Sequence, residues 1–496
     1  MPVRRLPHNP SVDHLKQQAK TLQRQVRAEE PEALALVAEL SPRADSPPPT
    51  FRLADAQLVI ARQYGFPSWP RLRAHLALVS RYSRSPHLQP IGGPLANRDA
   101  LADELLRLAC LTYGADNATR PARARELLAA NPEVATANVY TMAAVGEADA
   151  LAALLAREAE LANRQGGPYR WEPLLYLAYA RVEDDPPARS TLEAARLLLA
   201  SGADPNAGFL WEGLPSPFTA LTGAFGDGED GVNQPPHQHS LALARLLLEA
   251  GADPNDYQTL YNRHFRPNDD HLALLLAYGL GRGEGGPWHI RLGSELASPA
   301  VMIQDQLVWA ARMNYVDRVR LLLQHGVDVD GRGTRHPVVQ GRTAHEVATL
   351  NGHEEVAALL RAAGASMASL DTVETFLAAC LRADRAEVER LVTADPGLVA
   401  QAVEREPHVI IRAAETGRVE AVRLLAGLGF DANALHRVTA LHQAAWAGDL
   451  EMVRLFLELG ADPTVLDPAY NAPPLGWARH NRQEHVVTYL ESLGPA

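Results

Sequence analysis

The sequence has few of the residues that hold small or extracellular folds together covalently. Its 496 residues include two cysteines, Cys110 and Cys380, each within an apolar pattern of helical spacing. Two cysteines so far apart do not make a disulfide framework, and they suit a reducing cytoplasm. No apolar run reaches the roughly 20 residues that a membrane-spanning helix needs. We therefore expect a cytoplasmic protein with no disulfide and no membrane segment.

Lysine is scarce as well, because Lys16 and Lys20 are the only two among 47 basic residues. Arginine in their place, together with abundant alanine, is typical of a GC-rich bacterial genome. The net charge of −12 divides unevenly, with +6 over residues 1–88 and −18 over residues 89–496. An acidic body repels phosphate backbones, so we do not expect a nucleic acid as a partner.

Recognisable cofactor and metal motifs are missing. The phosphate loop, Gly-x-Ser-x-Gly and Cys-x-x-Cys do not occur. Gly281, Gly283 and Gly286 match the dinucleotide spacing, but a helical pattern precedes them where that motif requires a strand. His237 and His239 have no carboxylate or thiol ligands at a recognised spacing. The sequence predicts neither a cofactor nor a metal site.

A repeated two-helix pattern dominates the rest of the sequence. Its clearest copy runs from Thr439 to Pro463 and reads T-A-L-H-Q-A-A-W-A-G-D-L-E-M-V-R-L-F-L-E-L-G-A-D-P. Thr439 can cap the inner helix, Gly448 ends it, and Gly460 ends the outer helix. This copy resembles the ankyrin repeat, and weaker copies recur near the period of about 33 residues. The resemblance implies an all-α solenoid of stacked helix-turn-helix units.

Three parts are predicted along the chain. Residues 1–88 form an N-terminal helical module, whose segment Phe51–Leu72 resembles one that precedes the repeats of bacterial ankyrin proteins, and we expect it to cap the stack. Residues 89–305 are degenerate repeats with long inserts at Gly223–His239 and Gly279–Ser298. Residues 306–496 are six regular helix pairs, the third over Phe376–Pro396 and the fourth over Ile410–Gly429.

Aromatic residues gather in the degenerate part. Residues 165–310 hold 14 of the 29 aromatics. Large side chains there can simply fill gaps among irregular helices, or they can line a pocket for an apolar ligand or for a partner's side chains. In the second interpretation the candidate binding residues are Trp171, Tyr176, Trp211, Phe225, Tyr257, Tyr261 and Trp288.

A second set of candidates follows from the resemblance. In ankyrin proteins the variable positions of the inner helix face the concave groove. Carried over to this sequence, those positions are Trp309, Arg312, Arg412, Glu415, Gln443 and Trp446. Aromatic residues and arginine are enriched at protein interfaces. His442 falls at the structural histidine of the repeat, where a hydrogen bond between units is expected.

Two functions remain open on this evidence. The sequence favours a non-catalytic protein that recognises a protein partner through its concave groove and loops. The alternative is a cofactor-independent lyase, isomerase or cyclase on the same scaffold, acting on a largely apolar small molecule, as in bacterial natural-product biosynthesis. Such an enzyme would use acid/base chemistry for dehydration, conjugate addition, isomerisation or cyclisation. Its candidate catalytic residues are His264, Asp269, His271, Tyr261 and Glu415.

Overall fold

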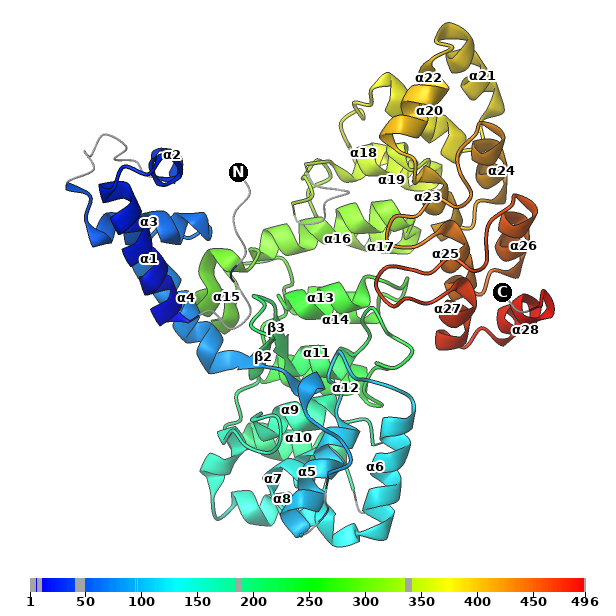
Figure 1. The fold of residues 1–496 in the computed structure, drawn as a ribbon. Helices are drawn as coiled ribbons and strands as arrows, with labels where there is room; N and C mark the ends of the chain where they lie inside the picture. The colour runs from blue at the N-terminus through cyan, green and yellow to red at the C-terminus, as the bar shows by residue number, and fades with distance from the viewer. Residues whose placement is uncertain are drawn as a thin grey trace. The chain divides into compact units, whose positions relative to one another are not determined.

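The structure, a computed structural model, describes residues 6, 11–40, 50–93, 95, 97–182, 189–334 and 341–494. It divides into two compact units, Met1–Pro299 and Ala300–Ala496, and the division falls at the start of helix α16. Both units are built mainly of short helices (Figure 1). The predicted all-α repeat fold is confirmed, whereas the predicted three-part division stays a prediction.

The first unit begins with a four-helix module. Its helices are α1 (Val12–Arg27), α2 (Pro31–Leu40), α3 (Leu53–Gln63) and α4 (Trp69–Tyr82). The Ser11 side chain caps α1, and Leu15, Leu22 and Val26 form its buried face at helical spacing. Ser68 caps α4, and Pro70 lies in its first turn, where a missing N–H is harmless.

A small sheet joins this module to the middle of the first unit. Strand β1 (Ser83–Arg84) pairs in parallel with β2 (Gly208–Trp211), which pairs in antiparallel fashion with β3 (Pro217–Thr219). Tyr82 also packs edge-on against Trp288, with ring centroids 5.0 Å apart. The module is therefore attached beside the β2–β3 hairpin. Its predicted role as a cap of the stack stays a prediction.

Helix pairs make up the remainder of the first unit. They are α5 (Arg98–Ala109), α6 (Thr119–Ala130), α7 (Val139–Val145), α8 (Ala148–Leu155), α9 (Pro173–Tyr179), α10 (Thr191–Ala200), α11 (Ala220–Phe225), α12 (Ser240–Glu249), α13 (Tyr257–Arg263) and α14 (Asp270–Ala277), followed by α15 (Pro287–Leu292). Short 3₁₀ helices lie at Pro86–Leu88, Pro132–Thr136, Ala159–Asn163 and Gly293–Glu295. Successive first helices pack on one another, as α7 does on α9 and α9 on α11.

The insert between α11 and α12 is held firmly in place. The buried Arg181 side chain donates hydrogen bonds of 2.7 to 3.0 Å to the main-chain carbonyl oxygens of Ala178, Ala180, Gly223 and Pro235. Asp227 in the insert pairs with Arg263 of α13 at 2.9 Å. These contacts make the insert part of the packed body of the first unit.

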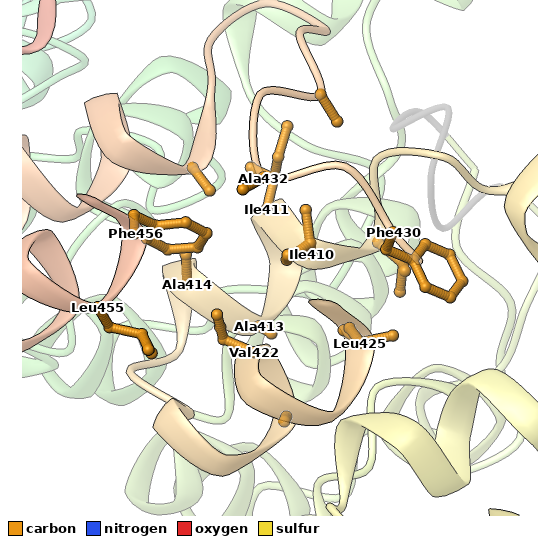
Figure 2. Close-up of a cluster of buried hydrophobic side chains, with 14 of the residues drawn as sticks. Ile410, Ile411, Ala413, Ala414, Val422, Leu425, Phe430, Ala432, Leu455 and Phe456 are labelled. Atoms are coloured by element: carbon orange, nitrogen blue, oxygen red, sulfur yellow. The ribbon is translucent and has the colours of Figure 1, made fainter. Parts of the chain in front are cut away.

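The second unit is a more regular series of helix pairs. Its helices are α16 (Pro299–Met313), α17 (Val316–Gln324), α18 (Ala344–Leu350), α19 (Glu354–Ala362), α20 (Thr372–Leu381), α21 (Arg385–Ala394), α22 (Leu398–Arg405), α23 (Val409–Glu415), α24 (Val419–Gly427), α25 (Ala440–Ala447), α26 (Leu450–Glu458), α27 (Pro474–His480) and α28 (Glu484–Ser492). One continuous core runs from α20 to α28, and Figure 2 shows its part around Ile410, Leu425 and Phe456.

Helix α22 departs from the predicted six pairs. The sequence predicted that the third pair ends at Pro396, with no helix before the fourth. Instead, Leu398 and Ala402 are fully buried, one turn apart, and draw residues 398–405 into a further helix. A short apolar spacing after a proline is too brief to be recognised from the sequence, and tertiary packing decides it here.

Candidate functional site

Four inner helices of the second unit place variable side chains on one face. On α23, α25 and α27, which pack in chain order, alanines turn into the core. The flanking positions point away from that core, and Trp309 and Arg312 occupy the matching positions of α16. We define the inner-helix face by these eight residues: Trp309, Arg312, Arg412, Glu415, Gln443, Trp446, Trp477 and His480.

Charged side chains occupy the first half of this face. Arg312 of α16 pairs with Glu415 of α23, with Nη2 and Oε2 separated by 3.1 Å, although the two residues are 103 positions apart in the sequence. The Arg312 guanidinium also lies over the Trp309 ring, 5.4 Å from its centroid. Arg412 reaches Asn351 at the end of α18 through a long hydrogen bond of 3.4 Å. We call Trp309, Arg312, Arg412 and Glu415 the ionic half.

Side-chain contacts hold the C-terminal ends of several inner helices together near the ionic half. Arg418 donates from Nη1 to the carbonyl oxygens of Asn351 and Leu381, at 2.6 and 2.9 Å. The Nδ1 atom of His353 lies 2.8 Å from the carbonyl oxygen of Ala311, and burial lowers the pKa of His353 to about 4. The last carbonyl groups of an α-helix have no partner within the helix, and the side chains of Arg418 and His353 bind such groups here. These ties bring α16, α18, α20 and α23 close together.

Aromatic side chains occupy the second half of the face. The rings of Trp446 and Trp477 meet edge-to-face at 5.6 Å, and His480 stacks on Trp446 at 5.7 Å. Tyr470, in the loop between α26 and α27, meets Trp477 at 6.1 Å and is 72% exposed. Trp446 and Trp477 are half-buried. We call Trp446, Trp477 and His480 of this face, together with the loop residue Tyr470, the aromatic half.

Asp467 fixes the position of this aromatic half. Its buried carboxylate accepts hydrogen bonds from Trp477 Nε1 at 2.9 Å and from the main-chain N–H of Tyr470 at 2.7 Å. Burial alone would raise the pKa of Asp467, but these and further main-chain hydrogen bonds outweigh burial and lower it. The loop that carries Tyr470 is thus built on an ionised carboxylate.

Family comparisons agree with this helix-pair architecture. A model of three ankyrin repeats matches residues 376–467, and a single ankyrin repeat matches residues 307–333. The chain belongs to the ankyrin repeat proteins. Both matches lie in the second unit, where the inner-helix face lies. Among curated proteins, none matches this chain.

The structural histidine of the ankyrin repeat has the predicted role. His442 is fully buried at the start of α25. Its Nδ1 atom lies 2.8 Å from the Thr439 hydroxyl, and its Nε2 atom lies 3.1 Å from the carbonyl oxygen of Ala472 in the following ankyrin unit. Burial lowers the pKa of His442, which favours the neutral ring, and the main-chain N–H of Thr439 donates to its Nδ1 atom at 3.3 Å.

Several predicted aromatic residues pack inside the first unit. Trp171, Tyr176 and Phe225 are at most 1% exposed. Trp171 contacts Phe209 in a stacked arrangement at 4.9 Å and contacts Tyr176 at 5.3 Å. This placement is what the gap-filling interpretation expects, because a buried ring cannot reach a partner. Their role in ligand binding stays a prediction.

Other predicted aromatic residues hold segments of the first unit together. Trp211 stacks on His87 at 4.5 Å and donates from Nε1 to the carbonyl oxygen of Thr112 at 3.0 Å. Trp288, in the second insert, donates to the carbonyl oxygen of Asn206 at 3.0 Å and is 4% exposed. Tyr257 begins α13 and is half-buried. The contacts of Trp211 and Trp288 join segments that are distant in sequence.

The catalytic candidates of the first unit lie on or beside α13 and α14. Tyr261 donates to Glu229 Oε1 at 2.5 Å, and its ring meets that of His264 at 4.9 Å. His271 is fully buried against Phe225, with the ring centroids 6.1 Å apart. Asp269 directly precedes α14. Glu415 lies in the second unit and pairs with Arg312. The catalytic role of these five residues stays a prediction.

The surroundings of the described histidines and acids give no sign of a metal centre. No group of three or more His, Cys, Asp or Glu side chains placed to hold a metal ion occurs within the described ranges. His237 is buried, and its Nδ1 atom accepts from the main-chain N–H of His239 at 3.0 Å.

In the part of the chain that the structure describes, no helix is both long and apolar enough to cross a membrane.

Sequence reasoning missed three of the four residues of the aromatic half. Trp477 and His480 occupy the same positions in α27 as Gln443 and Trp446 occupy in α25. The rule that selected Trp446 would have selected both, had it been extended by one ankyrin repeat. Tyr470 had no such signal, because it lies in a loop whose shape depends on Asp467.

Proposed function

We propose that this ankyrin protein binds a protein partner through the inner-helix face of its second unit and the loops beside that face. Ankyrin repeats generally mediate protein–protein interactions, and both family matches fall in this unit. The observation that carries the proposal is the aromatic half. Tyr470 is 72% exposed and Trp446 and Trp477 beside it are partly exposed, and contiguous exposed aromatic surface is costly unless a partner covers it.

The types of residue in the aromatic half also support the proposal, in addition to their exposure. Tryptophan and tyrosine are the residues most often found at the energetic centre of protein interfaces, where truncating one costs about 2 kcal/mol or more. Their rings have few rotatable bonds, and the contacts among Trp446, Trp477 and His480 restrict them further. A rigid aromatic surface loses little conformational entropy on binding.

Exposed apolar side chains extend this surface onto the adjoining loops. Leu435, between α24 and α25, is 40% exposed, and Leu466, between α26 and α27, is 45% exposed. Tyr470 belongs to the second of these loops. Two consecutive ankyrin loops thus present large apolar residues next to the aromatic half. This extension suits a partner segment that runs along the stack.

Affinity capture from the source cell tests the proposal. The bait is the full chain, compared with the double variant Trp446→Ala/Tyr470→Ala and with Leu493→Ala. Leu493 is 51% exposed and directly follows α28, outside the defined face, so it is a matched control. We expect one protein to be retained by the wild type and by Leu493→Ala, and lost by the double variant. Equal retention by all three baits would refute the proposal.

A further inference from the structure

We infer that the ionic half is a binding site for a single carboxylate, supplied by an acidic side chain of the partner. The site is formed by Arg312 and Arg412, with Glu415 at its edge. The inference rests on the proposed function, because it names the chemistry that the same face recognises. It differs from that proposal in predicting an acidic residue in the partner, where the aromatic half alone predicts only apolar ones.

The hydrogen-bonding capacity of Arg412 is largely unused. A guanidinium has five N–H donors, yet among the described residues Arg412 forms one hydrogen bond, the long one of 3.4 Å to Asn351 Oδ1. Its nearest carboxylate is Glu406, with Nη2 and Oε2 separated by 3.9 Å, and Glu406 is half-exposed. The Arg412 side chain itself is only 15% exposed. A cation so withdrawn from water ordinarily has close partners.

Arg312, the neighbouring cation, is also incompletely paired. Its Nη2 atom contacts Glu415 at 3.1 Å, and its Nη1 atom lies 3.0 Å from the sulfur of Met313, which is a weak acceptor. Its buried Nε atom has no hydrogen-bond partner among the described residues. Both arginines therefore retain donors that an added oxygen ligand can satisfy.

The two arginines of this site differ in how closely a carboxylate pairs with them. Burial lowers the pKa of Arg412; Glu406 and Glu415 oppose this effect, while Arg312 and Arg342 lower the pKa further. Arg342 pairs with Glu374, so it adds no net charge. Glu415 contacts Arg312 at 3.1 Å, whereas the carboxylate paired with Arg412 is that of the half-exposed Glu406, at 3.9 Å. A carboxylate of the partner can therefore give Arg412 the close, charge-assisted contact that Glu406 does not provide.

The distance to the aromatic half sets the spacing in the ligand. Glu415 and Trp446 hold the same position in consecutive inner helices, and packed helices lie about 8–10 Å apart. An extended chain advances about 3.3 Å per residue. We therefore expect the partner segment to place a large apolar residue about three residues from its acidic residue.

Selection from a random peptide library against the immobilised full chain tests this inference. The baits are the wild type, Arg412→Met, Glu415→Gln, Arg423→Met and the double variant Trp446→Ala/Tyr470→Ala. Arg423 lies on the outer helix α24, so its variant removes the same charge away from the site. The selected peptide is then synthesised with its acidic residue as Glu, as Gln and as phosphoserine, and binding is measured at fixed ionic strength.

We expect wild-type and Arg423→Met baits to select peptides with an acid about three residues from an aromatic or large aliphatic residue. The Gln peptide should bind the wild type roughly tenfold more weakly than the Glu peptide, since a charge-assisted contact is lost. Arg412→Met should bind both peptides alike, and Glu415→Gln should bind the Glu peptide more tightly. The Glu415→Gln result keeps the test decisive if Arg412→Met does not fold.

Three outcomes would overturn the inference. Selected peptides without an acidic residue, or a Glu-to-Gln penalty that persists in Arg412→Met, would remove the carboxylate site and leave the proposed function intact. Tighter binding of the phosphoserine peptide would assign the site to phosphate. If every selected peptide still binds the double variant Trp446→Ala/Tyr470→Ala, or if no peptide is selected at all, the proposed function is refuted, and this inference with it.

Discussion

The two units of this ankyrin protein differ in where their clusters of tryptophan and tyrosine lie. In the first unit, Trp171, Tyr176 and Tyr179 are 0% exposed and pack against one another. In the second unit, Trp446 and Trp477 are half-buried, and Tyr470 is 72% exposed. Aromatic content alone therefore does not locate a binding site. The position of each ring relative to the repeat does, because inner-helix and loop positions are free to contact a partner.

The units also differ in what holds them together. Large rings fill the irregular interior of the first unit, beside the inserts and the small sheet. In the second unit, where the repeats are regular, Arg418 and His353 tie the inner helices together at their ends. This difference predicts that truncating a clustered tryptophan or tyrosine affects mainly stability in the first unit and mainly binding in the second.

The largest expected effect is on the stability of the first unit. Trp171→Ala should lower its free energy of unfolding by about 3–5 kcal/mol, because a fully buried ring is removed and a cavity remains. Trp446→Ala, which truncates the same type of side chain in the second unit, should lower stability by clearly less, because that ring is partly exposed. Urea denaturation followed by circular dichroism measures both. Equal losses would remove the distinction between the units.

A smaller effect is expected from acid on the second unit. The pKa of His353 is lowered in the folded state from 6.5 to about 4, because the ring is buried beside Arg418. The folded state thus binds fewer protons, so stability is complete above pH 6.5 and is lost as the pH falls toward 4. At pH 5 the loss from this group is about 2 kcal/mol.

The variant His353→Gln isolates that contribution. It should flatten the stability of the second unit between pH 7 and pH 5, relative to the wild type. His325→Gln is the control, because His325 is exposed at the end of α17. An unchanged pH dependence in His353→Gln would show that the tie to Ala311 does not determine the acid sensitivity of this unit.

Asp467 tests whether the aromatic half is held rigidly. Asp467→Ala should cost about 1–3 kcal/mol, because several hydrogen bonds to a buried carboxylate are lost. It should also increase amide hydrogen exchange at Tyr470 and Ala472, which donate to that carboxylate. Unchanged exchange in residues 467–472 would contradict the role assigned to Asp467.

The smallest expected effect on stability belongs to the residues most important for binding. Tyr470→Ala should change the free energy of unfolding by less than about 0.5 kcal/mol, because the side chain is mostly solvent-exposed. The same variant should weaken partner binding at least roughly tenfold if the ring is a hot spot. A stability loss comparable to that of Trp171→Ala would mean that Tyr470 is structural.

The fold was largely predictable, because the repeat has a local cause. Threonine caps, helix-ending glycines and paired alanines recur with the period of the helix pair, as in Thr439, Gly448 and Ala444–Ala445. Helix α22 was not predictable, because packing of Leu398 and Ala402 decides it. The pairing of Ser83 with Leu210 joins segments more than a hundred residues apart and likewise leaves no local pattern.

The sequence predicted several residues of the candidate site but not which of them contact one another. Register in the repeat identified Arg312, Arg412, Glu415 and Trp446 as residues of one face. It gave no reason to expect Arg312 to contact Glu415, since three repeats of stacking would separate them by about 30 Å in a straight array. The ties made by Arg418 and His353 bring the inner helices together, and carbonyl contacts of that kind leave no sequence pattern.

Site-specific photo-cross-linking in the source cell tests the central claim most directly. A photoreactive phenylalanine analogue is placed singly at positions 446, 470 and 493 of the full chain. We predict one cross-linked protein shared by positions 446 and 470, with none at position 493. A cross-linked protein at position 493 alone, or at none of the three positions, would contradict the assignment of the inner-helix face as the partner-binding surface.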